Sequence, residues 1–238
     1  MRWLLVVAAF LGGCDYVLRI DHLAENVDAL PPDVLAANCR TAELVSSADT
    51  YLAGTTIHGS DDALIADANQ AALIKLYLDN IYMVGDRAAA LVVHIYAVDH
   101  ADACGASCGA CPAATATRFQ VYWSTPSWNP DQATQVDSRT GVMWIGMGAT
   151  GAGDRSTTAI VDDALPATTG AVDLRVPMHA VEQVLPDAWV SYDPPTMTGR
   201  LAIQIRTDGP LVFASDERSA SSCHDSRPPP SATVTLCQ

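Results

Sequence analysis

The 238-residue sequence has few basic residues: 13 lysines and arginines stand against 27 aspartates and glutamates, for a formal net charge of −14. Lys75 is the only lysine in the sequence. Because binding to nucleic-acid phosphates needs clustered lysine and arginine, this composition argues against a nucleic-acid partner. It also argues against adhesion of the folded surface to an anionic membrane.

Glutamate is scarce as well, since only four of the 27 acidic residues are glutamate and 23 are aspartate. Aspartate favours turns and loops, where its side chain bonds nearby backbone amides, whereas glutamate favours helices. The excess of aspartate therefore indicates a loop-rich β protein, with calcium binding as the second interpretation. With 49% hydrophobic and 17% charged residues, the chain is too apolar to be intrinsically disordered.

The N-terminus has the parts of a secretory signal. Arg2 precedes an apolar run at residues 4–11, which is too short to span a bilayer, and small residues lead into Cys14. The ending Leu-Gly-Gly-Cys resembles the bacterial lipobox, in which cleavage precedes the cysteine and the cysteine is acylated. The sequence thus predicts a signal peptide at residues 1–13, lipidation of Cys14, and an exported protein anchored by lipid to the cell envelope or cell surface.

Residues 14–42 show no sustained strand pattern and are interpreted as the lipidated cysteine with a flexible tether to one folded domain at residues 43–238. Apolar and polar residues alternate in several segments of the domain, which is typical of strands with one buried face. These segments are residues 118–123, 172–176, 200–206 and 233–236. Only residues 178–185 have a helical pattern. The sequence predicts an all-β fold, an antiparallel β-sandwich of jelly-roll type with one short helix.

Seven cysteines become six once Cys14 carries lipid, and an even number in an exported chain suggests disulfide bonds. Cys39 precedes the first predicted strand and Cys237 ends the last one. Since the first and last strands of a jelly roll commonly pair, we expect these two cysteines to be bonded. The remaining four are expected to join the loop at 101–116 to the loop at 215–230 and to form a bond within the first loop: Cys104, Cys108, Cys111 and Cys223.

Several short motifs occur in the order and spacing of a known family. They are residues 48–52 (ADTYL), 72–78, 90–96, the tryptophans at 123 and 128, and residues 199–203, 213–217 and 232–236. Together they resemble carbohydrate-binding module family 96, the DNRLRE-type domains, over roughly residues 45–237. The resemblance implies a β-jelly roll that binds polysaccharide, and an alginate-binding activity is known among members of that family.

Sugar binding depends on aromatic rings that stack on pyranose faces and on polar groups that bond the hydroxyls. Alternation predicts that Trp144 faces outward if Met143, Ile145 and Met147 point inward. On another strand, it places Tyr122 outward together with its polar neighbours. The predicted carbohydrate-binding residues are Trp144, Tyr122, Arg118, Lys75, Gln204 and Arg206. For each aromatic residue, packing in the core or under a loop is the alternative.

The most concentrated acidic group near a strand end is the candidate site for a structural calcium ion. Its members are Asp49, Asp61, Asp62 and Asp67. No GxSxG or HExxH motif occurs, and in a chain so rich in aspartate a chance pair of carboxylates proves little. We therefore expect no enzymatic activity.

These observations together predict a non-catalytic polysaccharide-binding lipoprotein of the cell envelope. The alternative is a structural or adhesive β-sandwich that docks other envelope proteins and recognises no sugar. Because basic residues are scarce, the sequence favours a neutral glycan, or an acidic glycan bridged by calcium.

Overall fold

The computed structural model describes residues 39–77, 87–98, 112–125, 127–176, 190–193, 198–216 and 227–237. The chain divides into two units, Met1–Cys39 and Arg40–Gln238. The described strands belong to the second unit, except that the first strand already begins at Cys39. The predicted signal peptide, Cys14 and the predicted helix at 178–185 lie outside the described residues. Within those residues, no helix is long and apolar enough to cross a membrane.

The described residues form strands and connecting loops, and the strands whose register is defined pair antiparallel. The strands are β1 (Cys39–Leu52), β2 (Ala63–Ala66), β3 (Ala71–Tyr77), β4 (Arg87–Ala97), β5 (Arg118–Trp123), β6 (Asp137–Arg139), β7 (Val142–Met143), β8 (Val161–Ala164), β9 (Gly170–Val176), β10 (Val190–Asp193), β11 (Thr198–Thr207), β12 (Leu211–Ala214) and β13 (Ser231–Cys237). Strand β1 includes residues 39–42, which the sequence pattern assigns to the tether, so the folded domain begins earlier than expected.

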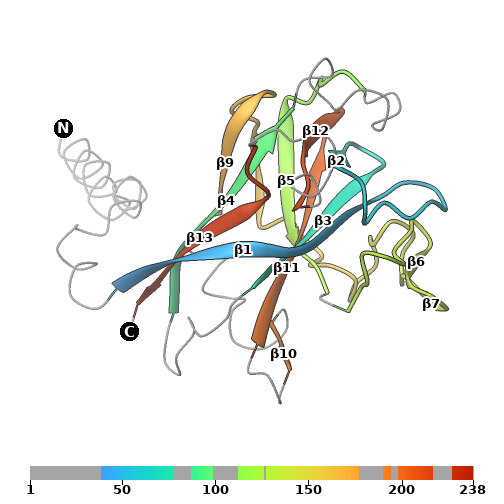
Figure 1. Ribbon diagram of the computed structural model, residues 1–238, viewed down its shortest axis with the longest axis horizontal. Coiled ribbons are helices and arrows are strands. Elements are labelled where there is room, and N and C mark those ends of the chain that lie inside the picture. Colours follow the sequence, from blue (N-terminus) through green and yellow to red (C-terminus); the bar gives the residue numbers. More distant parts are fainter. Residues whose placement is uncertain are drawn as a thin grey trace, which may run out of the picture. The chain divides into compact units, whose positions relative to one another are not determined.

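The strands form two layers (Figure 1). One layer has the order β1–β3–β11–β5–β8, and β10 also pairs with β11. In the other layer, β4 pairs with β9 on one edge and with β13 and β12 on the other, and β2 follows β12. Strands β1 and β13 are neighbours, so the layers join along one side.

Apolar side chains from both layers meet in one core. Ile74 of β3 and Ile203 of β11 come from one layer, and Val93 of β4, Leu174 of β9 and Phe213 of β12 from the other, all fully buried. Their removal from water is the main driving force for assembling the two layers. The predicted all-β antiparallel sandwich is therefore confirmed, while the connectivity of a jelly roll stays a prediction.

Cys39 and Cys237 are both disulfide-bonded. The register of β1 and β13 supports a bond between them. The backbone N–H of Ser46 donates to the carbonyl of Pro230 at 3.2 Å. Cys39 is seven residues before Ser46 on β1, and Cys237 is seven residues after Pro230, at the end of β13. In an antiparallel pair, these equal steps bring the two cysteines opposite each other. The other predicted disulfide cysteines, Cys104, Cys108, Cys111 and Cys223, lie outside the described residues.

A buried carboxylate connects β1 to the segment after β12. Asp49 is 1% exposed; it accepts hydrogen bonds from the hydroxyl of Ser215 at 2.7 Å and from the backbone N–H of Asp216 at 2.8 Å. Burial, and then the negative charge of Asp216, raise the pKa of Asp49 well above its usual value. The folded chain therefore holds a proton at this site more readily than the unfolded chain does.

This pKa shift predicts how stability depends on pH. Because the folded chain binds more protons, the free energy of unfolding should fall as pH rises from the ordinary aspartate pKa of 3.8 through the raised pKa of Asp49. Asp216→Asn removes the repelling charge and should flatten this dependence, whereas Asp131→Asn, at an exposed site, should leave it unchanged. Urea unfolding at a series of pH values measures the slope. A wild-type slope in Asp216→Asn contradicts the prediction.

Candidate functional site

The segment 127–155 includes the β6–β7 hairpin, which is labelled in Figure 1. Side chains of this segment pack on part of the outer face of the β1–β3–β11–β5 layer. Leu52 and Leu73 on this face pack against Trp128 and Trp144 of that segment in a second buried cluster. Lys75 points into the same region, where its ammonium lies 4.2 Å from the ring centroid of Trp128 and donates to the carbonyl of Trp128. The covering segment therefore adds a third layer to part of the sandwich.

The prediction that Trp144 faces solvent is wrong. Trp144 is 5% exposed, and its indole N–H donates to the carbonyl of Thr134 at 2.9 Å. Met143, Ile145 and Met147, which we expected to point inward, are instead 70%, 74% and 69% exposed. The predicted alternation placed the wrong set of side chains inward. The reason is that this segment runs from β7 into a loop that packs on the outside of the sandwich. In an alternating pattern, such an error inverts every side chain.

Lys75 and Gln204 are also buried, at 4% and 0% exposed, so the expectation that they face a ligand is wrong too. Both hold the covering segment in place. The side-chain amide of Gln204 donates to the carbonyl of Gly148 at 3.3 Å and accepts from Arg155 at 3.2 Å. The remaining three predicted carbohydrate-binding residues, Arg118, Tyr122 and Arg206, do come together in one cavity.

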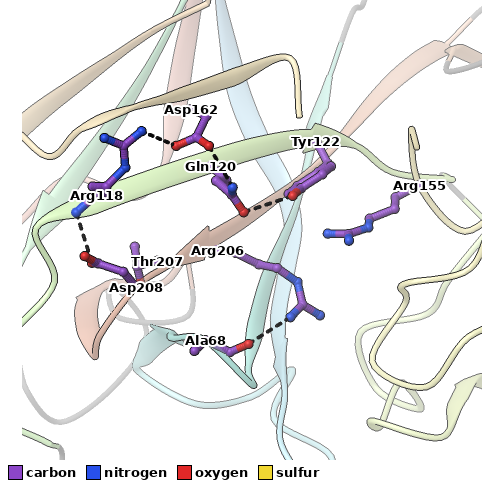
Figure 2. A pocket seen from close by; sticks show the side chains of 9 residues that line it. All are labelled: Ala68, Arg118, Gln120, Tyr122, Arg155, Asp162, Arg206, Thr207 and Asp208. Atoms are coloured by element: carbon purple, nitrogen blue, oxygen red, sulfur yellow. Dashed lines mark hydrogen bonds and ion pairs between the residues drawn. The ribbon is translucent and has the colours of Figure 1, made fainter. Parts of the chain in front are cut away.

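This cavity has a volume of about 360 Å³ and lies on the outer face of β5 and β11 (Figure 2). Strand pairing positions its side chains: Arg206 of β11 is opposite Gln120 of β5, and Asp162 of β8 is opposite Gln120 on the other edge. Alternation along β5 brings residues 118, 120 and 122 to the same face. The lining residues are Ala68, Arg118, Gln120, Tyr122, Arg155, Asp162, Arg206, Thr207 and Asp208.

One wall of the cavity is a chain of hydrogen bonds along β5 (Figure 2). Arg118 donates to one oxygen of Asp162 at 2.8 Å, and Gln120 donates to the other at 2.9 Å. Gln120 in turn accepts from the hydroxyl of Tyr122 at 2.9 Å. The hydrogen bonds from Gln120 and then Arg118 lower the pKa of Asp162, so its carboxylate stays ionised. The charges of Arg118 and Asp162 compensate each other on this wall.

Asp208 lies at the edge of the cavity, where β11 ends. Its carboxylate accepts hydrogen bonds from the hydroxyl of Thr117 and from the backbone N–H groups of Thr117 and Arg118. The Thr117 hydroxyl, followed by these N–H groups, lowers the pKa of Asp208 to about 2. Both carboxylates that line the cavity are therefore ionised and already engaged at neutral pH.

The opposite wall carries two guanidinium groups. Arg155 stacks on Tyr122 with 3.8 Å between its guanidinium carbon and the ring centroid. Arg206 donates to the carbonyls of Ala68 at 3.3 Å and Gly148 at 2.9 Å, while its buried Nε has no hydrogen-bond partner among the described residues. Burial, and then the charge of Arg155, lower the pKa of Arg206. Among the described residues, neither guanidinium has a carboxylate within ion-pair distance.

Sequence reasoning missed Arg155, which the sequence suggests only as part of a turn. The structure shows how Asp154 positions it. The buried carboxylate of Asp154 accepts backbone N–H groups of Ile145, Gly146 and Gly151 at 3.0, 2.8 and 3.0 Å. These three bonds fix the glycine-rich loop and the start of the next segment, so that Arg155 reaches over Tyr122. The available signal was an aspartate next to an arginine in a glycine-rich run. The sequence alone does not show which groups these two side chains contact.

The predicted calcium ligands do not form one site. Asp49 bonds Ser215 and Asp216; Asp61 bonds His58 at 2.8 Å, and Asp67 bonds the backbone N–H groups of its own turn. Asp62 accepts the N–H of Ser215 at its backbone carbonyl. Across the described part of the chain, no three histidine, cysteine or acidic side chains lie close enough together to hold a metal ion. Calcium binding stays a prediction.

Comparison with protein-family models and with curated proteins finds no match for this chain. The resemblance to carbohydrate-binding module family 96 therefore stays a hypothesis, and the cavity is interpreted from its own side chains. It offers guanidinium groups, a tyrosine hydroxyl, an amide and two ionised carboxylates. Such a set suits a small polar ligand that carries both hydroxyl groups and a negative charge.

The position of Trp144 gives a prediction about stability. Trp144→Ala should lower the free energy of unfolding by about 3–5 kcal/mol, because the lost indole leaves a space among buried side chains. Met143→Ala, at a neighbouring exposed site, should change it by less than about 0.5 kcal/mol. Denaturant unfolding compares the two variants. Wild-type stability in Trp144→Ala contradicts the buried position.

Proposed function

We propose that this protein is a polysaccharide-binding module whose cavity on β5 and β11 holds an acidic sugar unit without cleaving the sugar chain. The observation that carries the proposal is the pair of guanidinium groups, Arg155 and Arg206, without carboxylate partners in the described structure. The chain has 13 basic residues and a net charge of −14, yet three of its arginines line this one cavity. A volume of about 360 Å³ is in the range of small-ligand sites.

The geometry favours recognition through charge and hydrogen bonds. Guanidinium groups bind carboxylate or sulfate with paired, charge-assisted hydrogen bonds. The face of Tyr122 is occupied by Arg155, so ring stacking on Tyr122 is not the proposed mode of contact. Tyr122, Gln120 and Asp208 supply a hydroxyl, an amide and a carboxylate for sugar hydroxyls. The overall acidity of the chain favours a neutral or calcium-bridged glycan, whereas the charges of the cavity favour direct contact with an anionic one.

The state of the carboxylates supports binding without cleavage of the sugar chain. A glycosidase needs one carboxyl group that stays protonated near neutral pH to act as the acid. Asp162 and Asp208 both have lowered pKa values, so neither suits that role. The lipobox-like sequence ending at Cys14 supports an exported, lipid-anchored location, where the module would hold a glycan near the cell.

Binding to uronic-acid oligosaccharides tests the proposal. Arg155→Gln and Arg206→Gln should each weaken binding about ten- to a hundredfold, because each removes charged hydrogen bonds worth about 1.5–3 kcal/mol. Arg139→Gln changes the net charge equally at an exposed site on β6 outside the cavity, and should bind like wild type. Isothermal titration calorimetry with acidic and neutral oligosaccharides measures the affinities.

Three outcomes count against this assignment. Binding that is unchanged in Arg206→Gln excludes the cavity as the site. Binding restricted to neutral glycans excludes the anionic ligand. Binding that is lost with a chelator and kept in both arginine variants shows that calcium, rather than the guanidinium pair, holds the acidic sugar.

A second candidate function is a structural or adhesive module that docks other envelope proteins. The observation in its favour is the exposed apolar group of Met143, Ile145 and Met147 on the covering segment, since such groups commonly mark protein interfaces. Cross-linking in intact cells, compared with a variant in which all three residues are serine, tests it. Cross-linked partners that disappear in the serine variant, together with no glycan binding by the wild type, would favour this function over the first.

A further inference from the structure

A hydroxyl, an imidazole and a carboxylate are linked across three neighbouring strands on the outer face of the β4 layer. Nδ1 of His94 lies 2.7 Å from a carboxylate oxygen of Asp173, and Nε2 lies 2.8 Å from the hydroxyl of Thr233. Strand register produces this arrangement. Asp173 of β9 is directly opposite His94, and Thr233 of β13 is its diagonal neighbour, opposite Val92.

The hydrogen bonds define the roles of the two ring nitrogens. A carboxylate can only accept, so the proton of the neutral imidazole is on Nδ1, facing Asp173. Nε2 is then left as the acceptor for the hydroxyl proton of Thr233. A nucleophile bonded to a base, with the base oriented by a third group, is the arrangement that activates a hydroxyl for attack on acyl groups.

The side chains of His94 and Asp173 are accessible, and stability alone gives little reason for the arrangement. They are 35% and 57% exposed. Ion pairs and hydrogen bonds at such exposed positions contribute about 1 kcal/mol or less to folding. Thr233 is half-buried beside these two accessible side chains, and a substrate can reach it from the outer face of the sheet.

A cation lies on the same face. Arg175 of β9 is opposite Val92, which is also the partner of Thr233 on the other edge of β4. Arg175 is exposed and, among the described residues, has no carboxylate within ion-pair distance. Only the width of the central strand separates the two residues, so the long arginine side chain can stabilise negative charge that develops beside Thr233.

We propose that Thr233, His94 and Asp173 form a nucleophilic site that hydrolyses acyl esters, with Arg175 stabilising the oxyanion. The hydroxyl oxygen of Thr233 attacks the ester carbonyl carbon while its proton moves to Nε2 of His94. The bond between carbon and the alcohol oxygen breaks, and the leaving alcohol takes that proton. Water then attacks the acyl-threonine with its proton passing to His94, and the carboxylic acid leaves as Thr233 regains a proton.

The accessible side chains of His94 and Asp173 suit an ester group carried on an extended polymer, such as an O-acyl group on a glycan. This site is on the opposite layer from the arginine cavity and does not depend on it. The two proposals can therefore fail separately. Arg206→Gln should lose glycan binding but keep hydrolysis of a small ester that does not occupy the cavity, and Thr233→Val should do the reverse.

Hydrolysis of p-nitrophenyl acetate by the full chain, with acetate release from an O-acetylated polysaccharide as a second assay, tests the site. Thr233→Val removes the hydroxyl, keeps the branched shape, and should lower the rate at least tenfold. Thr233→Ser keeps the hydroxyl and should retain activity, as should Thr235→Val, the matched control on the same strand. Asp173→Asn should lower the rate while leaving the fold intact.

Mass spectrometry of the wild-type chain after brief exposure to the ester should locate a transient acyl group on Thr233. Circular dichroism shows whether each variant is folded. Equal rates in folded wild type and folded Thr233→Val overturn the proposal. So does an acyl group that forms only on residues other than Thr233.

Discussion

The arrangement of the cavity depends on how segment 127–155 is held on the outer face of the β3–β11–β5 layer. Lys75, the only lysine of the chain, is buried beneath this segment. A buried ammonium is costly unless a partner compensates it, and here the carbonyl and the ring of Trp128 do so. Gln204 and Arg206 bond the same segment at Gly148. Loss of this attachment would remove one wall of the cavity and expose the apolar residues beneath it.

Arg155 and Arg206 are neighbouring cations that have no ion-pair partner among the described residues. Such a pair is unfavourable in a folded chain, and the structure shows what holds the two side chains. The buried carboxylate of Asp154 fixes the loop that carries Arg155, and two carbonyls hold the guanidinium of Arg206. The carbonyls of Ala68 and Gly148 carry no net charge, and the carboxylate of Asp154 is engaged by backbone N–H groups. Neither anchor is therefore an ion-pair partner of the two guanidinium groups. Local arrangements that cost stability commonly coincide with functional sites, where a ligand supplies the missing interaction. An anion placed between Arg155 and Arg206 would relieve their repulsion.

The sequence predicted those features that depend on alternation within one strand. Residues 118–123 and 200–206 are strands, and their outward residues Arg118, Tyr122 and Arg206 do line one cavity. The same reasoning failed at Trp144, because its segment packs outside the sandwich and alternation alone cannot say which side is covered. The links from His94 to Asp173 and Thr233 join residues 79 and 139 positions apart. No local pattern encodes such contacts, since they depend on how distant strands pair.

The net charge of −14 is compatible with an anionic ligand when the distances over which charges act are considered. At physiological ionic strength, exposed charges are screened beyond about 8 Å, so repulsion from the remote acidic surface is weak at the cavity. Within that distance, a ligand meets Arg155 and Arg206, while the carboxylate of Asp162 is paired with Arg118. At low salt the acidic surface would slow the approach of an anionic polymer. Added salt would therefore speed the encounter even as it weakens the final contacts, so net charge is a poor guide to the ligand of this protein.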